Sequence, residues 1–151
     1  MVNCIPTALF RIFDANINRV KEGLRVCEEI MRFLLNSKSL TAECKDFRHS
    51  IDRLVKILGQ SEQFIKGRNA SKDIGLKVKH RDEFSRKNIF DIFYANIQRV
   101  KESLRVLEEC SKLSSPKIAL KFRNLRYRVY DFEKKALVEL NSLKCSKGVR
   151  N

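Results

Sequence analysis

Apolar residues recur along the first part of the chain at alternating steps of three and four. They are Ile17, Val20, Leu24, Cys27, Met31 and Leu34. Because an α-helix turns once every ~3.6 residues, this spacing puts all of them on one side of a helix. An aromatic-rich lead, LFRIFDA, stands before the stripe. The pattern therefore predicts a long helix from about Thr7 to about Asn36.

The same pattern occurs a second time. ANINRVKEGLRVCEE occupies residues 15–29, and ANIQRVKESLRVLEE occupies residues 95–109, behind another aromatic-rich lead, IFDIFYA. The second copy predicts a helix that begins near residue 88. A duplicated helix needs only its apolar positions and a small residue where helices cross, yet this repeat also keeps polar positions. The retained pairs are Asn16 and Asn96, Arg19 and Arg99, Lys21 and Lys101, Glu22 and Glu102, Arg25 and Arg105, Glu28 and Glu108, and Glu29 and Glu109.

A second helix is predicted after each copy. The segment TAECKDFRHSIDRLVKILG has helical apolar spacing and ends at Gly59, a residue suited to a helix C-cap. The segment IALKFRNLRYRVYDFEKKALVEL resembles it at an offset of 75, which aligns Arg123 with Arg48. The duplicated unit is therefore a pair of helices.

These segments predict an all-α fold in a single domain over residues 1–151. Four main helices form two repeated helix pairs with pseudo-twofold symmetry. Repeat one covers about residues 8–59 and repeat two about residues 88–142. Between them, the segment from about residue 60 to residue 87 lacks a clear helical period, which predicts a long central loop. A loop of this length in a compact domain is usually functional or disordered, and we favour a functional one.

The chain is strongly basic, with 32 Lys and Arg against 18 Asp and Glu and a net charge of +14. This charge indicates either a nucleic-acid or acidic-membrane surface, or a site for a phosphate-rich ligand. No basic leader with an apolar core begins the chain and no membrane-length apolar run follows, so we expect a cytoplasmic protein without a membrane span. The five cysteines lack CxxC spacing and predict free thiols, with Cys27 in the core.

The polar positions of the repeat have two interpretations. Asn16, Arg19 and Gly23 form a stripe beside the apolar one. In the first interpretation, Arg and Glu residues three or four apart form a ladder on a solvated face. In the second, arginines and carboxylates of both copies converge on a shared cleft, where they bind phosphate groups and a divalent metal. The common nucleotide-binding motifs GxxxxGK[ST] and GxGxxG are absent.

Four motifs occur together in one known family. They are FRIFDANINRVKEGLRVCEEIMRFLL, KDFRHSIDRL, RNASKDIG and ANIQRVKESLRVLEE. From about Phe10 to Glu133 the chain resembles a small helical domain, the monofunctional hydroxymethylpyrimidine phosphate kinase, found alone or fused to thiamine-phosphate synthase and often labelled thiamine-phosphate pyrophosphorylase. The resemblance implies phosphoryl transfer from ATP, with Mg²⁺, to hydroxymethylpyrimidine phosphate. It also implies small-molecule phosphates as ligands and thiamine-phosphate synthase as a candidate partner.

The residues that match these motifs are given roles by their side-chain chemistry, with guanidinium groups for phosphates and carboxylates for the metal. The catalytic candidates are Arg19, Glu22, Asp73 and Arg99. The candidates for substrate or phosphate binding are Asn16, Arg25, Arg48, His49, Arg68, Gly75, Asn96 and Arg105. The metal-ligand candidates are Asp73, Glu22 and Glu102.

Two alternatives stay open: a basic RNA-binding module, and a non-catalytic partner of thiamine-phosphate synthase. The run RNLRYRVY interleaves basic and aromatic residues, but the spacing of Tyr127 and Tyr130 favours core packing, which argues against nucleic acid as a partner. Whether the protein forms a homodimer stays open. Leu76 follows DIG where the family has a small hydroxyl residue, and Tyr94 replaces Asp14 in the second copy. We therefore expect either that the second half binds the substrate asymmetrically or that only one cleft is active.

Overall fold

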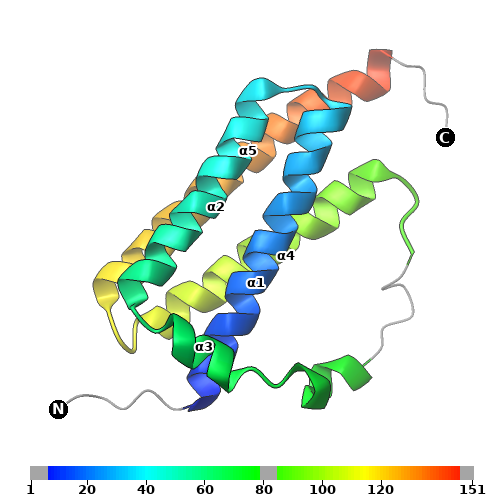
Figure 1. Ribbon diagram of the computed structural model, residues 1–151. Helices are drawn as coiled ribbons and strands as arrows, with labels where there is room; N and C mark the ends of the chain where they lie inside the picture. The colour runs from blue at the N-terminus through cyan, green and yellow to red at the C-terminus, as the bar shows by residue number, and fades with distance from the viewer. Residues whose placement is uncertain (1–6, 79–84, 147–151) are drawn as a thin grey trace.

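The computed structural model describes residues 7–78 and 85–146, and this part of the chain consists of helices and connections without a β-strand (Figure 1). The long helices are α1 (Thr7–Glu29), α2 (Lys38–Leu58), α4 (Ile89–Ser111) and α5 (Pro116–Ser146). The predicted all-α fold is confirmed. A π-helical stretch, Ile30–Leu34, extends α1 to near its predicted end. None of the described helices is long and apolar enough to cross a membrane.

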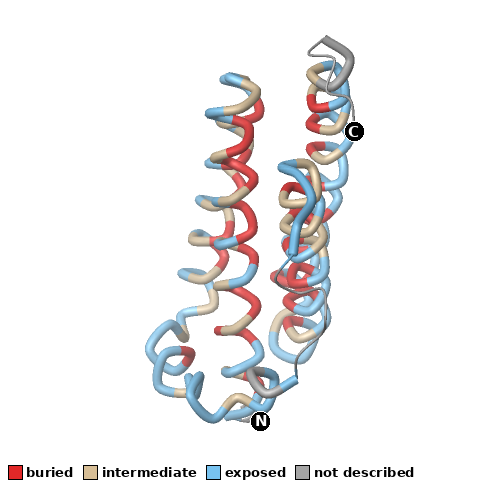
Figure 2. Tube along the Cα trace, turned by 90° about the vertical axis from the view of Figure 1, so that its right-hand side faces the viewer, coloured by how far each residue is buried: buried red, intermediate tan, exposed pale blue. Residues whose placement is uncertain are grey.

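The long helices pack through one shared core. α1 lies against α2 and α4, and α5 lies against the same two helices. The buried positions, red in Figure 2, lie mainly on the sides of the helices that face one another. The largest fully buried rings are those of Phe13, Phe47, Phe93, Phe122 and Phe132. Phe47 and Phe132 meet edge-on with their centroids 5.6 Å apart, which joins α2 to α5.

α1 and α4 approach closely at Gly23. A methyl group on this residue would lie 2.8 Å from Val100 Cγ2 and 2.9 Å from the carbonyl oxygen of Asn96. Protein interiors are close-packed, so no larger side chain fits there unless α4 shifts. The corresponding residue of the second copy, Ser103, is also small and is buried. The small residues of the repeat therefore serve the contact between the two copies.

Two residues with positive φ end helical segments. Gly59 has a φ of 65° and caps α2, as predicted, and its N–H donates to the carbonyl of Val55 at 3.3 Å. Asn36 has a φ of 51° and follows the π-helical stretch, at the turn into α2. Glycine and asparagine adopt this left-handed region at lower cost than other residues, which fits both turns.

The central segment contains more structure than the predicted loop. The short helix α3 (Ser61–Gly67) and two 3₁₀ turns, Ala70–Lys72 and Ile74–Lys77, occur in it. Phe64 of α3 is buried and stacks on Phe13 of α1, with the ring centroids 5.6 Å apart. A helix this short has too little periodicity to be recognised from sequence. Its buried ring fastens the start of the central segment to α1.

The second helices of the two repeats align three residues away from the predicted offset. Arg48 of α2 pairs with the buried Glu28 at 2.6 Å, and Arg126 of α5 pairs with the buried Glu108 at 2.8 Å. Arg126, and not the exposed Arg123, is therefore the counterpart of Arg48, at an offset of 78. The sequence match favoured an identical Phe-Arg dipeptide, whereas the fold aligns the partners of the two buried carboxylates.

Tyr127 and Tyr130 lie on the surface of α5, with 52% and 39% of their areas exposed, so the prediction of core packing is wrong. The guanidinium carbon of Arg126 lies 5.3 Å and 5.6 Å from their ring centroids. Such contacts between a cation and an aromatic face stabilise rings that remain partly in water. The spacing of three residues reflects neighbouring positions on the outer side of the helix.

We expect Gly23→Ala to lower the free energy of unfolding by about 1–3 kcal/mol, because the added methyl group overpacks the contact with α4. The change should appear as a lower urea midpoint in circular dichroism. Gly67→Ala is the control, since a methyl group there would lie 3.5 Å or more from its nearest neighbours. Equal midpoints for Gly23→Ala and the unchanged protein would contradict the close crossing.

Candidate functional site

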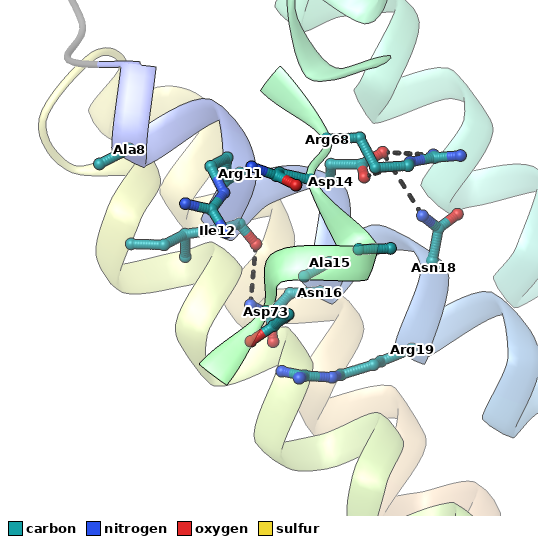
Figure 3. A pocket seen from close by; sticks show the side chains of 12 residues that line it. Ala8, Arg11, Ile12, Asp14, Ala15, Asn16, Asn18, Arg19, Arg68 and Asp73 are labelled. Carbon is teal, nitrogen blue, oxygen red and sulfur yellow. Dashed lines mark hydrogen bonds and ion pairs between the residues drawn. The ribbon is translucent and has the colours of Figure 1, made fainter. Parts of the chain in front are cut away.

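A pocket of about 560 Å³ lies between the first half of α1 and the segment that follows α3 (Figure 3). The described residues that line it are Ala8, Arg11, Ile12, Asp14, Ala15, Asn16, Asn18, Arg19, Arg68, Asn69, Ala70 and Asp73. Four of the predicted site residues meet here: Asn16 and Arg19 from the first copy of the repeat, and Arg68 and Asp73 from the RNASKDIG motif. The two motifs, far apart in sequence, therefore form one site.

An ion pair joins the two walls of the pocket. Arg68 donates from Nε to Asp14 Oδ2 at 2.7 Å and from Nη2 to Asp14 Oδ1 at 2.6 Å. Asn18 lies 3.4 Å from the same Oδ1. Asp14 is buried, whereas about half of the Arg68 side chain is exposed. The hydrogen bonds to Asp14 raise the pKa of Arg68, and the bidentate geometry makes this a strong contact. Arg68 therefore attaches the central segment to α1.

Asp73 and Asn16 lie in the middle of the pocket (Figure 3). Asp73 Oδ1 accepts the N–H of Gly75 at 2.9 Å, which orients the carboxylate at the start of the second 3₁₀ turn. Asn16 donates to the carbonyl oxygen of Ile12 at 2.8 Å, so its amide oxygen faces away from that bond. The predicted binding residue Gly75 thus acts on the pocket through the Asp73 side chain.

Arg19 differs from most arginines of the repeats because its charge is not neutralised by a neighbour. Within the described part of the chain, no hydrogen bond or ion pair to its side chain is formed, although it lines the pocket. Figure 3 shows its side chain passing beneath Asp73. A free guanidinium group beside an amide and a carboxylate suits an anionic ligand with several oxygens.

The other predicted residues of repeat one lie outside the pocket. Arg48 donates two hydrogen bonds to Glu28 Oε2, at 2.9 Å and 2.6 Å, and Arg25 lies 3.4 Å from the other oxygen of this buried carboxylate. These arginines neutralise a buried charge. Glu22 and His49 are exposed. Of the predicted ladder, only pairs between Arg25 and the following glutamates are present in this repeat.

The predicted residues of repeat two do not line this pocket. Arg105 lies 3.1 Å from the buried Glu108, just as its counterpart does in repeat one. Glu102 and Arg105 border a separate hollow of about 440 Å³ over α4 and α5. Arg99 is exposed and Asn96 donates to a carbonyl of its own helix at 2.8 Å. The shared cleft expected from the sequence is not formed around the pocket, and ligand contacts by these four residues stay predictions.

Metal binding is limited by the number of free carboxylates. In the described residues, no group of three or more His, Cys, Asp or Glu side chains is placed to hold a metal ion. The predicted ligands Asp73, Glu22 and Glu102 therefore do not form one ligand set. Asp14 is engaged by Arg68, which leaves Asp73 as the available carboxylate of the pocket. One carboxylate suits Mg²⁺ that arrives with phosphate oxygens and keeps several waters.

The cysteines with described side chains take no part in the pocket. Cys27 and Cys44 are buried, Cys110 is partly buried, and all three are free thiols. Burial raises the pKa of Cys27 to about 12, and burial also raises the pKa of Cys44. Both thiols are protonated at neutral pH, so neither supplies a thiolate nucleophile. The prediction of Cys27 as a core residue is confirmed.

Four polar residues of the pocket were given no role by the sequence: Arg11, Asp14, Asn18 and Asn69. Asp14 lies in the aromatic-rich segment before the first copy of the repeat. Its contact with Arg68 forms only in the tertiary fold, so local sequence does not reveal it. Arg11 lies eight residues before Arg19, a spacing of about two helical turns that could have marked it as a neighbour.

Comparison with known proteins places these motifs in a family. The sequence model of the ThiD2 family matches residues 11–135. A thiamine-phosphate synthase of Synechocystis sp. is 39% identical over 133 residues, which are 88% of this chain and 37% of that protein. Proteins of the same name from Nostoc sp. and Rhodopirellula baltica are 40% and 35% identical over 129 and 130 residues, respectively. These stretches are 85% and 86% of this chain and 35% and 34% of the relatives.

The chain thus spans about a third of the length of these relatives. No solved structure matches it significantly.

We expect Arg48→Gln to lower the free energy of unfolding by about 3 kcal/mol, because it leaves the buried Glu28 without its main partner. Chemical denaturation measures the change. Arg53→Gln is the matched control, since this exposed arginine pairs with Asp46 at 3.7 Å and such surface pairs contribute about 0–1 kcal/mol. Equal losses in the two variants would contradict a special role for Arg48.

We expect Arg68→Gln to loosen the central segment without unfolding the long helices, because the bidentate contact to Asp14 is lost. Amide hydrogen exchange should become faster across residues 64–73 and stay unchanged in α4 and α5. Lys66→Gln removes the same charge from the same segment and serves as the control, since Lys66 reaches only the exposed Glu62. Unchanged exchange in Arg68→Gln would show that Phe64 alone holds the segment.

Proposed function

Because the chain belongs to the ThiD2 family, we propose that it is a phosphotransferase of thiamine biosynthesis. The reaction is the ATP-dependent phosphorylation of hydroxymethylpyrimidine phosphate to the diphosphate. The observation that carries this proposal is the pocket in which an unneutralised Arg19 meets Asn16 and Asp73. The names of the relatives support the pathway, since each is called a thiamine-phosphate synthase.

The chemistry needs little from the protein beyond positioning and charge. A phosphate oxygen of the pyrimidine substrate attacks the γ-phosphorus of ATP, the bond from this phosphorus to the bridging oxygen breaks, and ADP leaves. Such transfers are accelerated mainly by alignment of the reactants and by neutralisation of the phosphate oxygens. Arg19 offers a planar pair of N–H donors for these oxygens. Direct transfer requires no covalent enzyme intermediate.

Asp73 supplies the one available carboxylate for Mg²⁺, which would be bound jointly with the nucleotide phosphates. Bound Mg²⁺ lowers the negative charge that the attacking phosphate meets. The bond from Gly75 N–H to Asp73 Oδ1 holds one oxygen, and within the described residues Oδ2 has no hydrogen-bond or ion-pair partner. Asn16 lies beside it and offers an amide oxygen or N–H to the ligand. Each of these roles can be tested by substituting a single residue.

A second candidate function is a non-catalytic partner of a separate thiamine-phosphate synthase. The observation that favours it is that the relatives carry the matched region within longer chains named thiamine-phosphate synthase. The basic RNA-binding module is the third candidate and is favoured by the net charge of +14 alone. Turnover by the isolated protein separates the first function from both others.

We expect the isolated protein to convert ATP and hydroxymethylpyrimidine phosphate, with Mg²⁺, into ADP and the diphosphate, measured by ³¹P NMR. Arg19→Gln should lower kcat/KM about 10- to 150-fold, because a charge-assisted contact contributes about 1.5–3 kcal/mol. Arg123→Gln, on exposed α5 surface, should leave the rate unchanged. Absence of turnover, combined with tight binding to thiamine-phosphate synthase or to RNA, would replace the proposed function with the corresponding alternative.

A further inference from the structure

We infer that Arg11 is a second anion-binding residue of the pocket, so that the pocket receives two separate phosphate groups, one beside Arg11 and one beside Arg19. The inference rests on the proposed function only for the identity of the ligands. It adds a binding residue outside the matched polar positions of the repeat. It also gives the two phosphates of a transfer reaction, that of the donor and that of the acceptor, distinct places on one helix.

The charge balance inside the pocket is the first reason. Three guanidinium groups and two carboxylates line it. Asp14 and Arg68 neutralise each other through two short hydrogen bonds. Within the part of the chain that the structure describes, neither Arg11 nor Arg19 has an ion-pair or hydrogen-bond partner. Two unneutralised cations therefore face one remaining carboxylate, Asp73, and the pocket attracts anions.

The placement of the two arginines is the second reason. Eight residues separate them on α1, which corresponds to about 12 Å along the helix axis. Figure 3 shows Arg11 and Arg19 on opposite sides of Asn16 and Asp73. Both residues line the same pocket. An anion beside each would bring two phosphate groups toward the carboxylate between them, where a metal-assisted transfer would occur.

The surroundings of Arg11 show that it is positioned by the fold. Its side-chain Cγ would lie 3.6 Å from a methyl group built on Gly67, so the end of α3 comes close to its aliphatic stem. α3 is in turn held by the stacking of Phe64 on Phe13. The stem is thereby supported while the residue as a whole stays exposed at the pocket. Arginine commonly buries its stem and presents its charged group in this way.

The second repeat shows that the duplicated frame does not need an arginine at this place. The residue that matches Arg11 is Asp91. Its carboxylate accepts the N–H of Lys87 at 3.1 Å, and its own N–H donates to the N-cap residue Asn88 at 3.0 Å, so it helps to stabilise the start of α4. An acidic residue is suited to a helix start, whereas an unpaired arginine is not. Arg11 is therefore explained by the pocket and not by helix formation.

Binding of inorganic phosphate, followed through the Nε–Hε NMR signals of the arginine side chains, tests the inference without catalysis. The titration is made against chloride at constant ionic strength, because a basic chain also binds anions weakly over its surface. We expect the signals of Arg11 and Arg19 to shift and that of Arg123 to stay in place. In Arg19→Gln, the Arg11 signal should still respond, with its dissociation constant changed by less than about threefold, as for independent sites.

Two outcomes at Arg11 would overturn the inference: a signal that does not respond in the unchanged protein, or one that stops responding in Arg19→Gln. The second outcome would mean that the two arginines share a single anion. A response of Arg123 equal to that of Arg11 would also overturn it, as general surface binding. Arg11→Lys should keep the charge but weaken phosphate binding, because lysine lacks the paired donors. Phosphate binding without turnover would leave the inference standing and overturn only the proposed kinase activity.

Discussion

The close crossing of α1 and α4 at Gly23 determines how the rest of the molecule is arranged. It sets the two copies of the repeated motif against each other, so their apolar stripes bury one another. Arginines next to those stripes, such as Arg19 and Arg25, then lie at the exposed edges of the contact. Arg19 lies at such an edge, which becomes part of a pocket because the central segment folds back over α1. Helix packing therefore fixes the position of Arg19, and the central segment completes the pocket around it.

The two repeats supply similar frames but unequal sites. Buried Glu28 with Arg48, and buried Glu108 with Arg126, join the helices of each pair in the same way. The contact that closes the pocket has no such counterpart, since the residue that matches Asp14 is the exposed Tyr94. The short helix α3 likewise follows only repeat one within the described residues. A single site on a duplicated frame is the arrangement these differences favour.

The sequence was sufficient for the long helices, because their apolar spacing extends over many turns. It was insufficient for α3, whose one buried ring, Phe64, gives no period. The sequence comparison misaligned α2 with α5, because it matched Arg48 to Arg123 by residue identity. The structural counterpart of Arg48 is Arg126, which contacts the buried Glu108. The polar identities of the repeat correctly drew attention to Arg19. They could not separate it from Arg25, which differs only in having carboxylate neighbours in the fold.

Total charge says less about ligands than the balance within the pocket. A net charge of +14 fits nucleic acid, membranes and phosphates equally well. In the pocket, however, Asp14 and Arg68 neutralise each other, and their contact attaches the central segment to α1. The charges of Arg11 and Arg19 are therefore the ones that a ligand would neutralise. The two proposed phosphate groups would carry more negative charge than these two cations can neutralise. The proposed Mg²⁺ beside Asp73 would offset part of that excess.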